Sequence, residues 1–444
     1  MRTALHLPLP AGAAVLVFCL GCSGNRNHSS APSFTTQPAS QTVYALGTAT
    51  FTVTVAGDPA PTFSWERSDD AGATWNPIPG ATSATYGFTV QATDNGSQFK
   101  AIASNPSATV ASLPATLTEV TAVYAAGLAR TSSTIPAIWV NGTAITPPGV
   151  LGQVNALAVN GTELLAGGYE YQNLVGSMPG YWASGQWLGL PMALFNGSGI
   201  GVVNALAASG TSIYAGGYNG DPLSNLAIPG YWLDGTLTSL PLPPAPVPVS
   251  GMVLALALSG SDLYAGGYIN NGGTIQPGLW QNGTWVSLSP TSSGMITCLA
   301  VANGNVYAGG SGGQAGPGYW LNGTWASLPL PADGTLGAVK AMTVAGSDVY
   351  AAGFYQNAGG YVPGYWLNGT WTRLPLPSGA GYGEVSVFVV AGGNVYAGGW
   401  TGTWSSSGDP TSAVPGYWLN GIWTALPAPA TATYSYLNAL VVVP

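Results

Sequence analysis

The residues that could carry out chemistry are few, and their positions exclude several reaction types. The two histidines, His6 and His28, lie near the N-terminus, and of the three cysteines only Cys298 lies beyond residue 22. Ser-His-Asp and Cys-His catalysis need a histidine base, and most zinc and copper sites need histidine or clustered cysteine. The main part of the chain can build neither, and we expect no metal or other cofactor.

Carboxylates in the longer loops are the remaining catalytic candidates. A glycosidase needs two positioned carboxyl groups. The loop carboxylates are Glu170, Asp221, Asp333, Glu384 and Asp409. They form no motif, so we expect a protein that is not an enzyme and keep a carbohydrate-active enzyme as the third hypothesis.

Aromatic and amide side chains in the loops favour binding. Trp400 and Trp404 are predicted to lie in one loop without counterparts in the repeats described below. An exposed aromatic ring offers a flat apolar platform for a sugar ring, although loop aromatics can also pin their own loop. The candidate ligand-binding residues are Trp400, Trp404, Asp409, Tyr171, Asn173, Tyr218, Asp221, Asn270, Tyr355 and Gln356.

The charge of the chain argues against nucleic acid as a partner. Its 444 residues include 7 Lys and Arg against 15 Asp and Glu, a formal charge of -8. No basic stripe could neutralise phosphates. Charged residues make up only 5%, and 65 glycines and 35 prolines argue against helical bundles.

Three sequence elements recur seven times between residues 121 and 444. A Tyr-Ala-Gly-Gly element begins at Tyr124, Leu165, Tyr214, Tyr264, Tyr307, Tyr350 and Tyr396. A Pro-Gly-Tyr-Trp-Leu-Asn-Gly-Thr-Trp element has its first tryptophan at Trp139, Trp182, Trp232, Trp280, Trp320, Trp366 and Trp418. An Asn-Ala-Leu-Ala-Val element begins at Asn155, Asn204, Leu254, Thr297, Lys340, Ser386 and Asn438. A spacing of about 46 residues is typical of propeller blades.

Each repeat can be written as a meander of four strands. Asn-Gly between the last two strands predicts a two-residue type I′ turn, which needs positive φ at both positions. Because the first repeat starts at its second strand, we expect the strand over residues 437–443 to complete it. The Gly-Gly doublet and the tryptophan followed by Leu-Pro resemble a kelch-type propeller, which implies a seven-bladed β-propeller over residues 121–444.

The N-terminus is typical of an exported protein. Arg2 precedes an apolar run over residues 11–20, which favours a signal peptide over residues 1–21. Cys19-Leu-Gly-Cys22 resembles a bacterial lipobox, and this resemblance implies a lipid anchor on Cys22; the alternative is ordinary signal-peptide cleavage. Residues 22–33 are polar and are predicted to form a flexible tether.

Residues 34–120 alternate polar and apolar side chains, which predicts antiparallel strands. The run from Gly47 to Val53, Trp65 and the run from Asp94 to Ala101 resemble an I-set-like immunoglobulin domain. In that family two cysteines bridge the sheets. Val53 and Ala101 occupy those places here, so we expect apolar packing around Trp65 to hold the sandwich.

A motif within this segment invites a functional interpretation. Residues 68–75 match the Ser-x-Asp-x-Gly-x-Thr-Trp pattern and resemble the Asp-box of sialidase-like propellers. Asp and Gly at a bend satisfy backbone donors and allow positive φ. We therefore interpret the motif as a structural turn.

The sequence thus predicts an all-β, exported, monomeric protein in which an immunoglobulin-like sandwich precedes the propeller. Our leading hypothesis is a surface or outer-membrane lipoprotein, otherwise a secreted protein. Its variable loops, carried on a rigid scaffold, would recognise a neutral polysaccharide or another surface component. The second hypothesis is a protein-interaction scaffold or adhesin that binds a surface protein.

Overall fold

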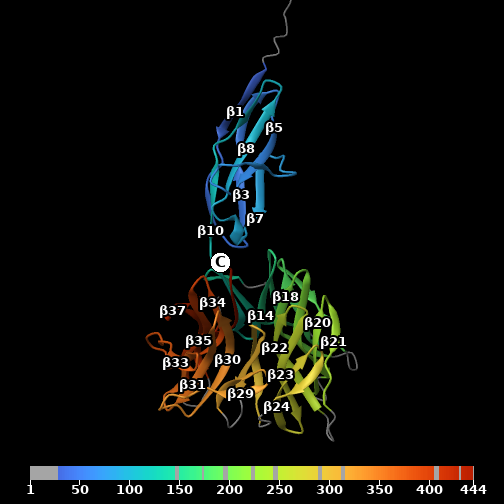
Figure 1. Cartoon of the computed structure of the whole chain (residues 1–444), viewed down its shortest axis with the longest axis vertical. Helices are drawn as coiled ribbons and strands as arrows, with labels where there is room; N and C mark the ends of the chain where they lie inside the picture. Colours follow the sequence, from blue (N-terminus) through green and yellow to red (C-terminus); the bar gives the residue numbers. More distant parts are fainter. Residues whose placement is uncertain are drawn as a thin grey trace, which may run out of the picture. The chain divides into compact units, whose positions relative to one another are not determined.

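The chain is built of β-strands, as Figure 1 shows. The computed structural model describes residues 29–443 apart from 146–149, 173–174, 194–198, 222–225, 244–248, 289–292, 312–315, 405–409 and 430–431. The predicted signal peptide, the lipidation site Cys22, and the candidates Asn173 and Asp409 lie outside the described residues. The prediction of an all-β protein is confirmed, because the described chain has 38 strands and one 3-10 helix, η1 (Ala92–Asp94).

The chain divides into two compact units. The first comprises the chain up to residue 39 with residues 51–86 and 98–115, and the second comprises residues 40–50, 87–97 and 116–444. The first ten strands are β1 (Ser30–Thr36), β2 (Gln41–Tyr44), β3 (Thr48–Thr52), β4 (Thr54–Asp58), β5 (Thr62–Ser68), β6 (Asn76–Pro77), β7 (Thr85–Thr89), β8 (Gln98–Asn105), β9 (Ala108–Ala111) and β10 (Ala115–Val120). β1 pairs with β4 and β3 with β7, while the other sheet has the order β2-β10-β8-β5-β6 with β9 on β8. The first strand begins at Ser30, before the predicted domain boundary at residue 34.

The first unit has an aromatic core. Trp65, Phe51 and Phe99 are fully buried, and the rings of Phe51 and Phe99 stack with centroids 4.8 Å apart. Trp65 lies opposite Ala101 in the register of β5 and β8, and its Nε1 donates to the carbonyl of Ser83 at 2.9 Å. Apolar packing around Trp65 therefore holds this core, as the sequence predicts.

Seven four-stranded antiparallel sheets make up the body of the second unit. The first three sheets in chain order are β38 (Tyr434–Val443), β11 (Ala122–Arg130), β12 (Thr134–Val140) and β13 (Thr143–Ile145); β14 (Gly152–Asn160), β15 (Glu163–Gln172), β16 (Gly176–Ala183) and β17 (Gln186–Gly189); and β18 (Ile200–Ser209), β19 (Ser212–Asp221), β20 (Leu226–Leu233) and β21 (Thr236–Ser239). The next two are β22 (Val249–Ser259), β23 (Asp262–Asn271), β24 (Thr274–Gln281) and β25 (Thr284–Ser287); and β26 (Met295–Ala302), β27 (Asn305–Ser311), β28 (Pro317–Leu321) and β29 (Thr324–Ser327). The last two are β30 (Leu336–Ala345), β31 (Asp348–Asn357), β32 (Gly360–Leu367) and β33 (Thr370–Arg373); and β34 (Tyr382–Ala391), β35 (Asn394–Trp404), β36 (Pro410–Leu419) and β37 (Ile422–Ala425).

The recurring residues have the same structural roles in sheet after sheet. Trp232, Trp280, Trp366 and their counterparts are fully or almost fully buried. The Nε1 of Trp280 donates to the carbonyl of Pro241 at 2.9 Å, and that of Trp366 to the carbonyl of Pro329 at 2.8 Å. Each of these carbonyls belongs to the Leu-Pro that ends the preceding sheet. The tryptophan and the Leu-Pro of the repeat are therefore partners across neighbouring sheets.

The Gly-Gly doublet and the Asn-Gly turn also have direct structural causes. The strand opposite Gly217 carries a bulge between Val203 and Ala205, and a Cβ on Gly217 would lie 1.9 Å from the carbonyl oxygen of Val202. Asn368 and Gly369 have φ of 48° and 84°, so positive φ at both turn positions is confirmed. The Oδ1 of Asn368 accepts the backbone N–H of Val349 at 2.9 Å.

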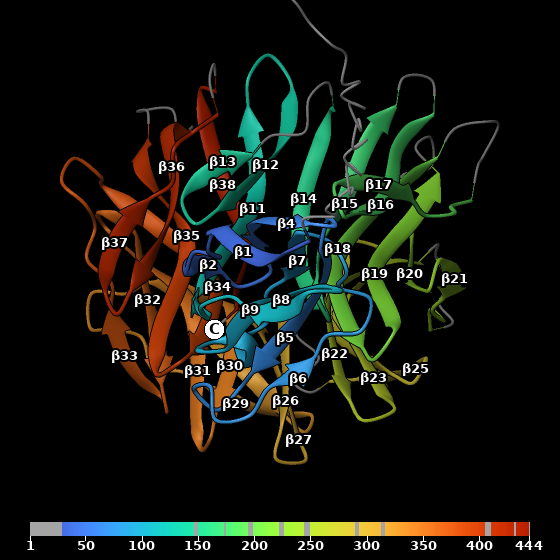
Figure 2. The ribbon, with the colours of Figure 1, turned by 90° about the horizontal axis from the view of Figure 1, so that it is seen from above.

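The sheets follow one another in chain order, from teal to red in Figure 2. The first strand of each sheet contacts the first strand of the next, in the order β14, β18, β22, β26, β30, β34, β38 and again β14. The last strand, β38, pairs with β11 from Ala122 opposite Val443 to Arg130 opposite Tyr434. The predicted pairing of the C-terminal strand with the first repeat is thus confirmed.

Candidate functional site

Most of the predicted binding residues lie in strands rather than in loops. Tyr171, Tyr218, Asp221, Asn270, Tyr355 and Gln356 all belong to the second strand of their sheet, close to the hairpin that leads to the third strand. Trp404 ends β35, and Asn173 and Asp409 lie outside the described residues. We call these ends of the sheets the hairpin tips.

The prediction for Trp400 is wrong in two respects. Trp400 lies within β35 and is only 8% exposed, so it is no open platform. It also has counterparts, because Trp400 pairs with Pro415 as Tyr169 pairs with Pro179 and Phe354 with Pro363. The residue that follows Gly-Gly is thus aromatic in several repeats. The ring of Trp400 packs against the rings of Tyr382 and Tyr436 and does not lie in a loop.

Trp400 supports a groove at the hairpin tips between two sheets. The groove has a volume of about 310 Å³ and is lined by Gln356, Asn357, Ala358, Gly359, Gly360, Tyr361 and Tyr382. We call it the hairpin-tip groove. Tyr382 meets Trp400 edge to face, with centroids 6.0 Å apart and planes at 79°. Tyr361 lies against Phe354 with centroids 4.4 Å apart. Both groove tyrosines are therefore held by a second aromatic ring behind them.

A network of polar side chains fixes the β31–β32 hairpin that forms one wall. The Nδ2 of Asn357 donates to the Oδ2 of Asp333 at 2.7 Å, and the hydroxyl of Tyr355 donates to the same oxygen at 3.3 Å. These bonds to Asn357 and Tyr355 lower the pKa of Asp333, so it stays ionised. The Oδ1 of Asn357 accepts the N–H of Gly359 at 2.9 Å. Tyr355 is 3% exposed and acts behind the groove, not in it.

A second groove lies between the first two sheets of the unit. It has a volume of about 260 Å³, and its lining includes Tyr169, Tyr171, Ser133, Thr134 and Ser177. Tyr171 is 49% exposed, which places a predicted binding residue at an open surface. All polar side chains of its lining carry hydroxyl groups, whereas the hairpin-tip groove also has the amides of Gln356 and Asn357.

The other candidates have local roles. The Oδ1 of Asn270 accepts the N–H of Gly273 at 2.9 Å and shapes its own hairpin. Tyr218 lies among buried groups, and burial together with the neighbouring Tyr169 and Tyr268 raises the pKa of its hydroxyl. Asp221 is the last residue of β19. Tyr218 and Asn270 do not line either groove.

Two of the candidate carboxylates, Glu384 and Asp333, are engaged by neighbouring side chains. Glu384 lies 3.4 Å from Nζ of Lys340, and burial raises the pKa of its carboxyl group. Asp333 is occupied by Asn357 and Tyr355. Within the part of the chain that the structure describes, no three His, Cys, Asp or Glu side chains gather as metal ligands would.

Sequence reasoning missed Tyr361 and Tyr382 as groove residues. Tyr361 follows Gly359-Gly360, and a Cβ on Gly360 would lie 3.2 Å from Cδ1 of Tyr382. Gly360 and Tyr382 therefore bring the two sheets close together, and both residues line the groove. The signal in the sequence was the Gly-Gly-Tyr at a hairpin, but the partner ring comes from the next sheet.

A family model and one curated relative each match about a fifth of the chain. A model of a domain of unknown function, DUF8696, matches residues 35–122. Endoglucanase C of Cellulomonas fimi is 36% identical over 88 residues, which are 20% of this chain and 8% of that protein. The chain therefore matches only a small part of the length of this relative.

Solved structures with immunoglobulin domains also match. A chimeric titin Z1Z2 is 26% identical, with 21% of this chain and 96% of that chain covered and a TM-score of 0.17. Immunoglobulin domains 1–5 of Sidekick-1 are 28% identical, with 20% of each chain covered and a TM-score of 0.17. A DUF4784 family protein from Bacteroides caccae is 10% identical, with 80% of this chain and 98% of that chain covered and a TM-score of 0.30. The chain is an all-β protein with immunoglobulin-like structural neighbours.

Across the residues that the structure describes, we find no helix with the length and apolar character needed to cross a membrane.

Proposed function

We propose that this chain is an exported binding protein whose second unit is a seven-bladed, kelch-like β-propeller that holds a saccharide at its hairpin tips. The succession of contacts between the first strands of neighbouring sheets, returning from β38 to β14, supports the propeller. The pairing of β38 with β11 supports closure by the C-terminal strand. A rigid scaffold of this kind suits loops that carry binding residues.

The observation that carries the binding proposal is the lining of the hairpin-tip groove. Tyr361 presents a half-buried ring, and Gln356 and Asn357 present amides, within one cavity of about 310 Å³. Tyr382 is only 7% exposed and packs behind this surface. Sugar rings combine apolar faces with hydroxyl edges, and such sites pair aromatic faces with a few placed polar groups. The proposed ligand is a neutral polysaccharide, since the groove lining carries no charged side chain.

The proposed role is binding without catalysis. Asp333 is held by Tyr355 and Asn357, and Glu384 is paired with Lys340. Neither carboxylate lines the hairpin-tip groove. The C. fimi relative is an endoglucanase, and similarity to part of such a protein supports a role at a polysaccharide. The lipobox-like Cys22 supports an anchor at the membrane, so that the propeller meets its ligand outside the cell.

The test is a glycan and polysaccharide array with the purified protein. We expect saturable binding to at least one neutral polysaccharide, and Tyr361→Ala should weaken it about fivefold or more, because a stacked ring contributes on the order of 1 kcal/mol or more. Ile422→Thr is the matched control, since Ile422 is 72% exposed on β37 and threonine stands at this position in other repeats. It should leave binding unchanged.

Two results would contradict this function. The absence of glycan binding by a well-folded protein would favour the alternative of a protein-interaction scaffold or adhesin. Equal binding by the Tyr361→Ala variant would place any saccharide site away from the hairpin-tip groove.

A further inference from the structure

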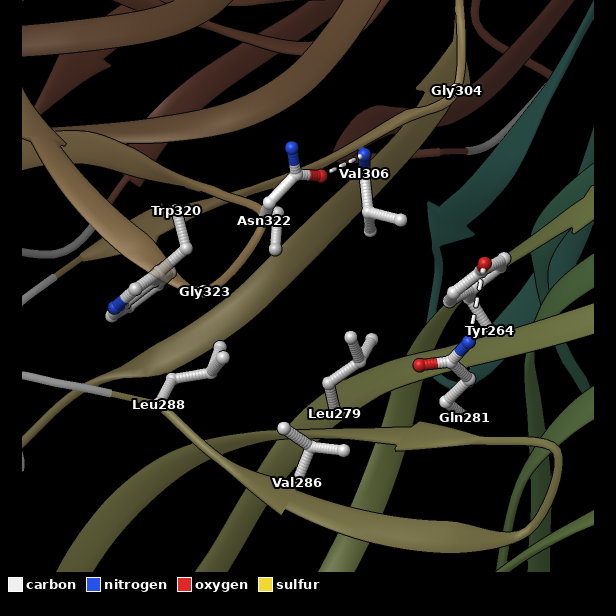
Figure 3. Close-up of a pocket in the computed structure, with 11 residues that line it drawn as sticks. Tyr264, Leu279, Gln281, Val286, Leu288, Gly304, Val306, Trp320, Asn322 and Gly323 are labelled. Carbon is white, nitrogen blue, oxygen red and sulfur yellow. Dashed lines mark hydrogen bonds between the residues drawn. The ribbon is translucent and has the colours of Figure 1, made fainter.

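A second cavity lies between the sheet β22–β25 and the sheet β26–β29, away from the hairpin tips. Its volume is about 300 Å³. Figure 3 shows Leu279, Val286 and Leu288 on one side of it and Val306 and Trp320 across the gap. We call it the seam cavity. The lining residues Asn322 and Gly323 belong to an Asn-Gly turn, so the cavity lies at the turn ends of the strands.

The seam cavity lies where the repeat departs from its own pattern. The residue before the buried tryptophan of the third strand is a tyrosine in five sheets: Tyr181, Tyr231, Tyr319, Tyr365 and Tyr417. Four of these rings lie beside the tyrosine of the second strand, with centroids 6.0 to 6.5 Å apart. The sheet β22–β25 has Leu279 at this position, opposite Gly266 in the register.

The missing ring would have packed against the neighbouring sheet. Tyr319 packs in one apolar cluster with Trp366 of the following sheet, and Tyr365 packs likewise with Trp418. Leu279 occupies the same place in the cluster of Trp320. Leu279 therefore stands where the equivalent seams have a tyrosine ring, and the seam cavity lies beside it.

A second departure adds a polar group to the same cavity. Gln281 stands where Leu233, Leu321, Leu367 and Leu419 stand in other sheets. Its Nε2 donates to the hydroxyl of Tyr264 at 3.4 Å, and both side chains line the cavity. The first sheet has an aliphatic Ile138 at the position of Leu279, but Val140 stands at the position of Gln281. The apolar space and the polar side chain occur together only in the sheet of Leu279.

We propose that the seam cavity binds a phenolic ring, a ligand class beyond the saccharide proposed above. The ring would lie against Leu279 and Val286, of which Val286 is 37% exposed. Its hydroxyl would bond to the amide of Gln281 or the hydroxyl of Tyr264. An apolar cavity of about 150 Å³ can hold a benzene ring, so this larger one can hold a substituted phenol.

The probe is p-cresol, the side chain of tyrosine as a free molecule. We expect saturable binding to the full protein by calorimetry, with chemical-shift changes and a higher melting temperature, because a ligand that binds only the folded state stabilises it. Leu279→Tyr should weaken binding strongly by placing a second ring where the ligand ring would lie. It should also raise the melting temperature, since the ring restores the packing of the other seams. Leu279→Phe is a second filling variant in case the tyrosine hydroxyl finds no partner.

Gln281→Leu tests the polar contact. This variant restores the leucine found in four other repeats. It should bind p-cresol about fivefold more weakly while binding toluene as well as the parent does, since one hydrogen bond contributes about 1 kcal/mol. Ile422→Thr again serves as the control and should bind p-cresol with the affinity of the parent.

The tripeptide Gly-Tyr-Gly distinguishes two sources of the phenolic ring. Displacement of p-cresol assigns the site to a tyrosine side chain presented by a peptide, and failure to displace it assigns the site to a free phenolic compound.

Three results would overturn the proposal. One is no saturable binding of p-cresol by the folded parent. Another is unchanged binding by a folded Leu279→Tyr or Leu279→Phe variant. The third is equal affinity of the parent for p-cresol and toluene, which would leave the amide of Gln281 without a role.

Discussion

At the scale of single residues, Asp70 shows how a motif that resembles a functional signature can be wholly structural. Its Oδ1 accepts the N–H of Thr74 at 2.8 Å and the hydroxyl of Ser68 at 2.8 Å, and its Oδ2 accepts the hydroxyl of Thr74 at 2.6 Å. These bonds, chiefly those from Thr74, lower the pKa of Asp70 to about 2. The carboxylate organises the turn around Gly72, as the sequence predicts for this motif.

The lowered pKa gives a pH-dependent prediction for Asp70→Asn. A carboxylate with a lowered pKa in the folded state stabilises that state above its ordinary pKa, and the effect is lost as the pH falls through the lowered value. The variant should therefore melt a few degrees below the parent at pH 6. The difference should shrink as the pH falls from about 4 to about 2. Thermal melts at both ends of this range measure it, and a difference that does not depend on pH would contradict the role of the charge.

At the scale of strands, the second glycine of each doublet is required by the bulge in the strand beside it. Gly217→Ala would place a Cβ 1.9 Å from the carbonyl oxygen of Val202, where backbone must move. We expect a loss of about 2–4 kcal/mol in the free energy of unfolding, as for overpacking at a fixed backbone. Urea denaturation measures this loss.

Gly189→Ala is the matched control for this glycine. Gly189 lies in a strand of the same unit, and the nearest atoms to its Cβ would be 3.7 Å away, an ordinary contact. This variant should be within about 0.5 kcal/mol of the parent. Equal losses in the two variants would show that glycine, and not the bulge, decides stability there.

The same scale shows what the sequence could and could not predict. Strands, turns and the pairing of the last strand with the first repeat were predictable, because Asn-Gly turns and recurring tryptophans constrain each strand locally. The repeat itself predicts a buried ring at Trp400, since the residue after Gly-Gly is also Tyr169, Tyr218 and Tyr268. The hairpin-tip groove was not predictable in this way. Tyr361 and Tyr382 meet only because two sheets pack together, and the seam cavity likewise needs residues of two sheets.

At the scale of the second unit, its stability should depend on its last strand. β38 pairs with β11 along its whole length and also contacts β14 and β34. Leu437 and Leu440 are buried in one cluster with the fully buried Trp139 and with Leu426. The strand therefore joins the first sheets of this unit to its last sheet.

Deletion of the chain from Leu437 onward should lower the melting temperature sharply, by ten degrees or more. Burial of a leucine side chain stabilises a fold by about 1.5–3 kcal/mol, and the deletion also leaves β11 with an unpaired edge. Calorimetry of the purified protein should show the loss in the transition of the second unit. The N-terminal core around Trp65 should keep its own transition, because none of its buried aromatic residues lies in β38. An unchanged transition of the second unit would contradict closure by the C-terminal strand, and with it the propeller proposed here.

Leu440→Ala removes one buried side chain and keeps the strand. It should lower the melting temperature of the second unit by less than the deletion does, as expected if both packing and pairing of β38 contribute.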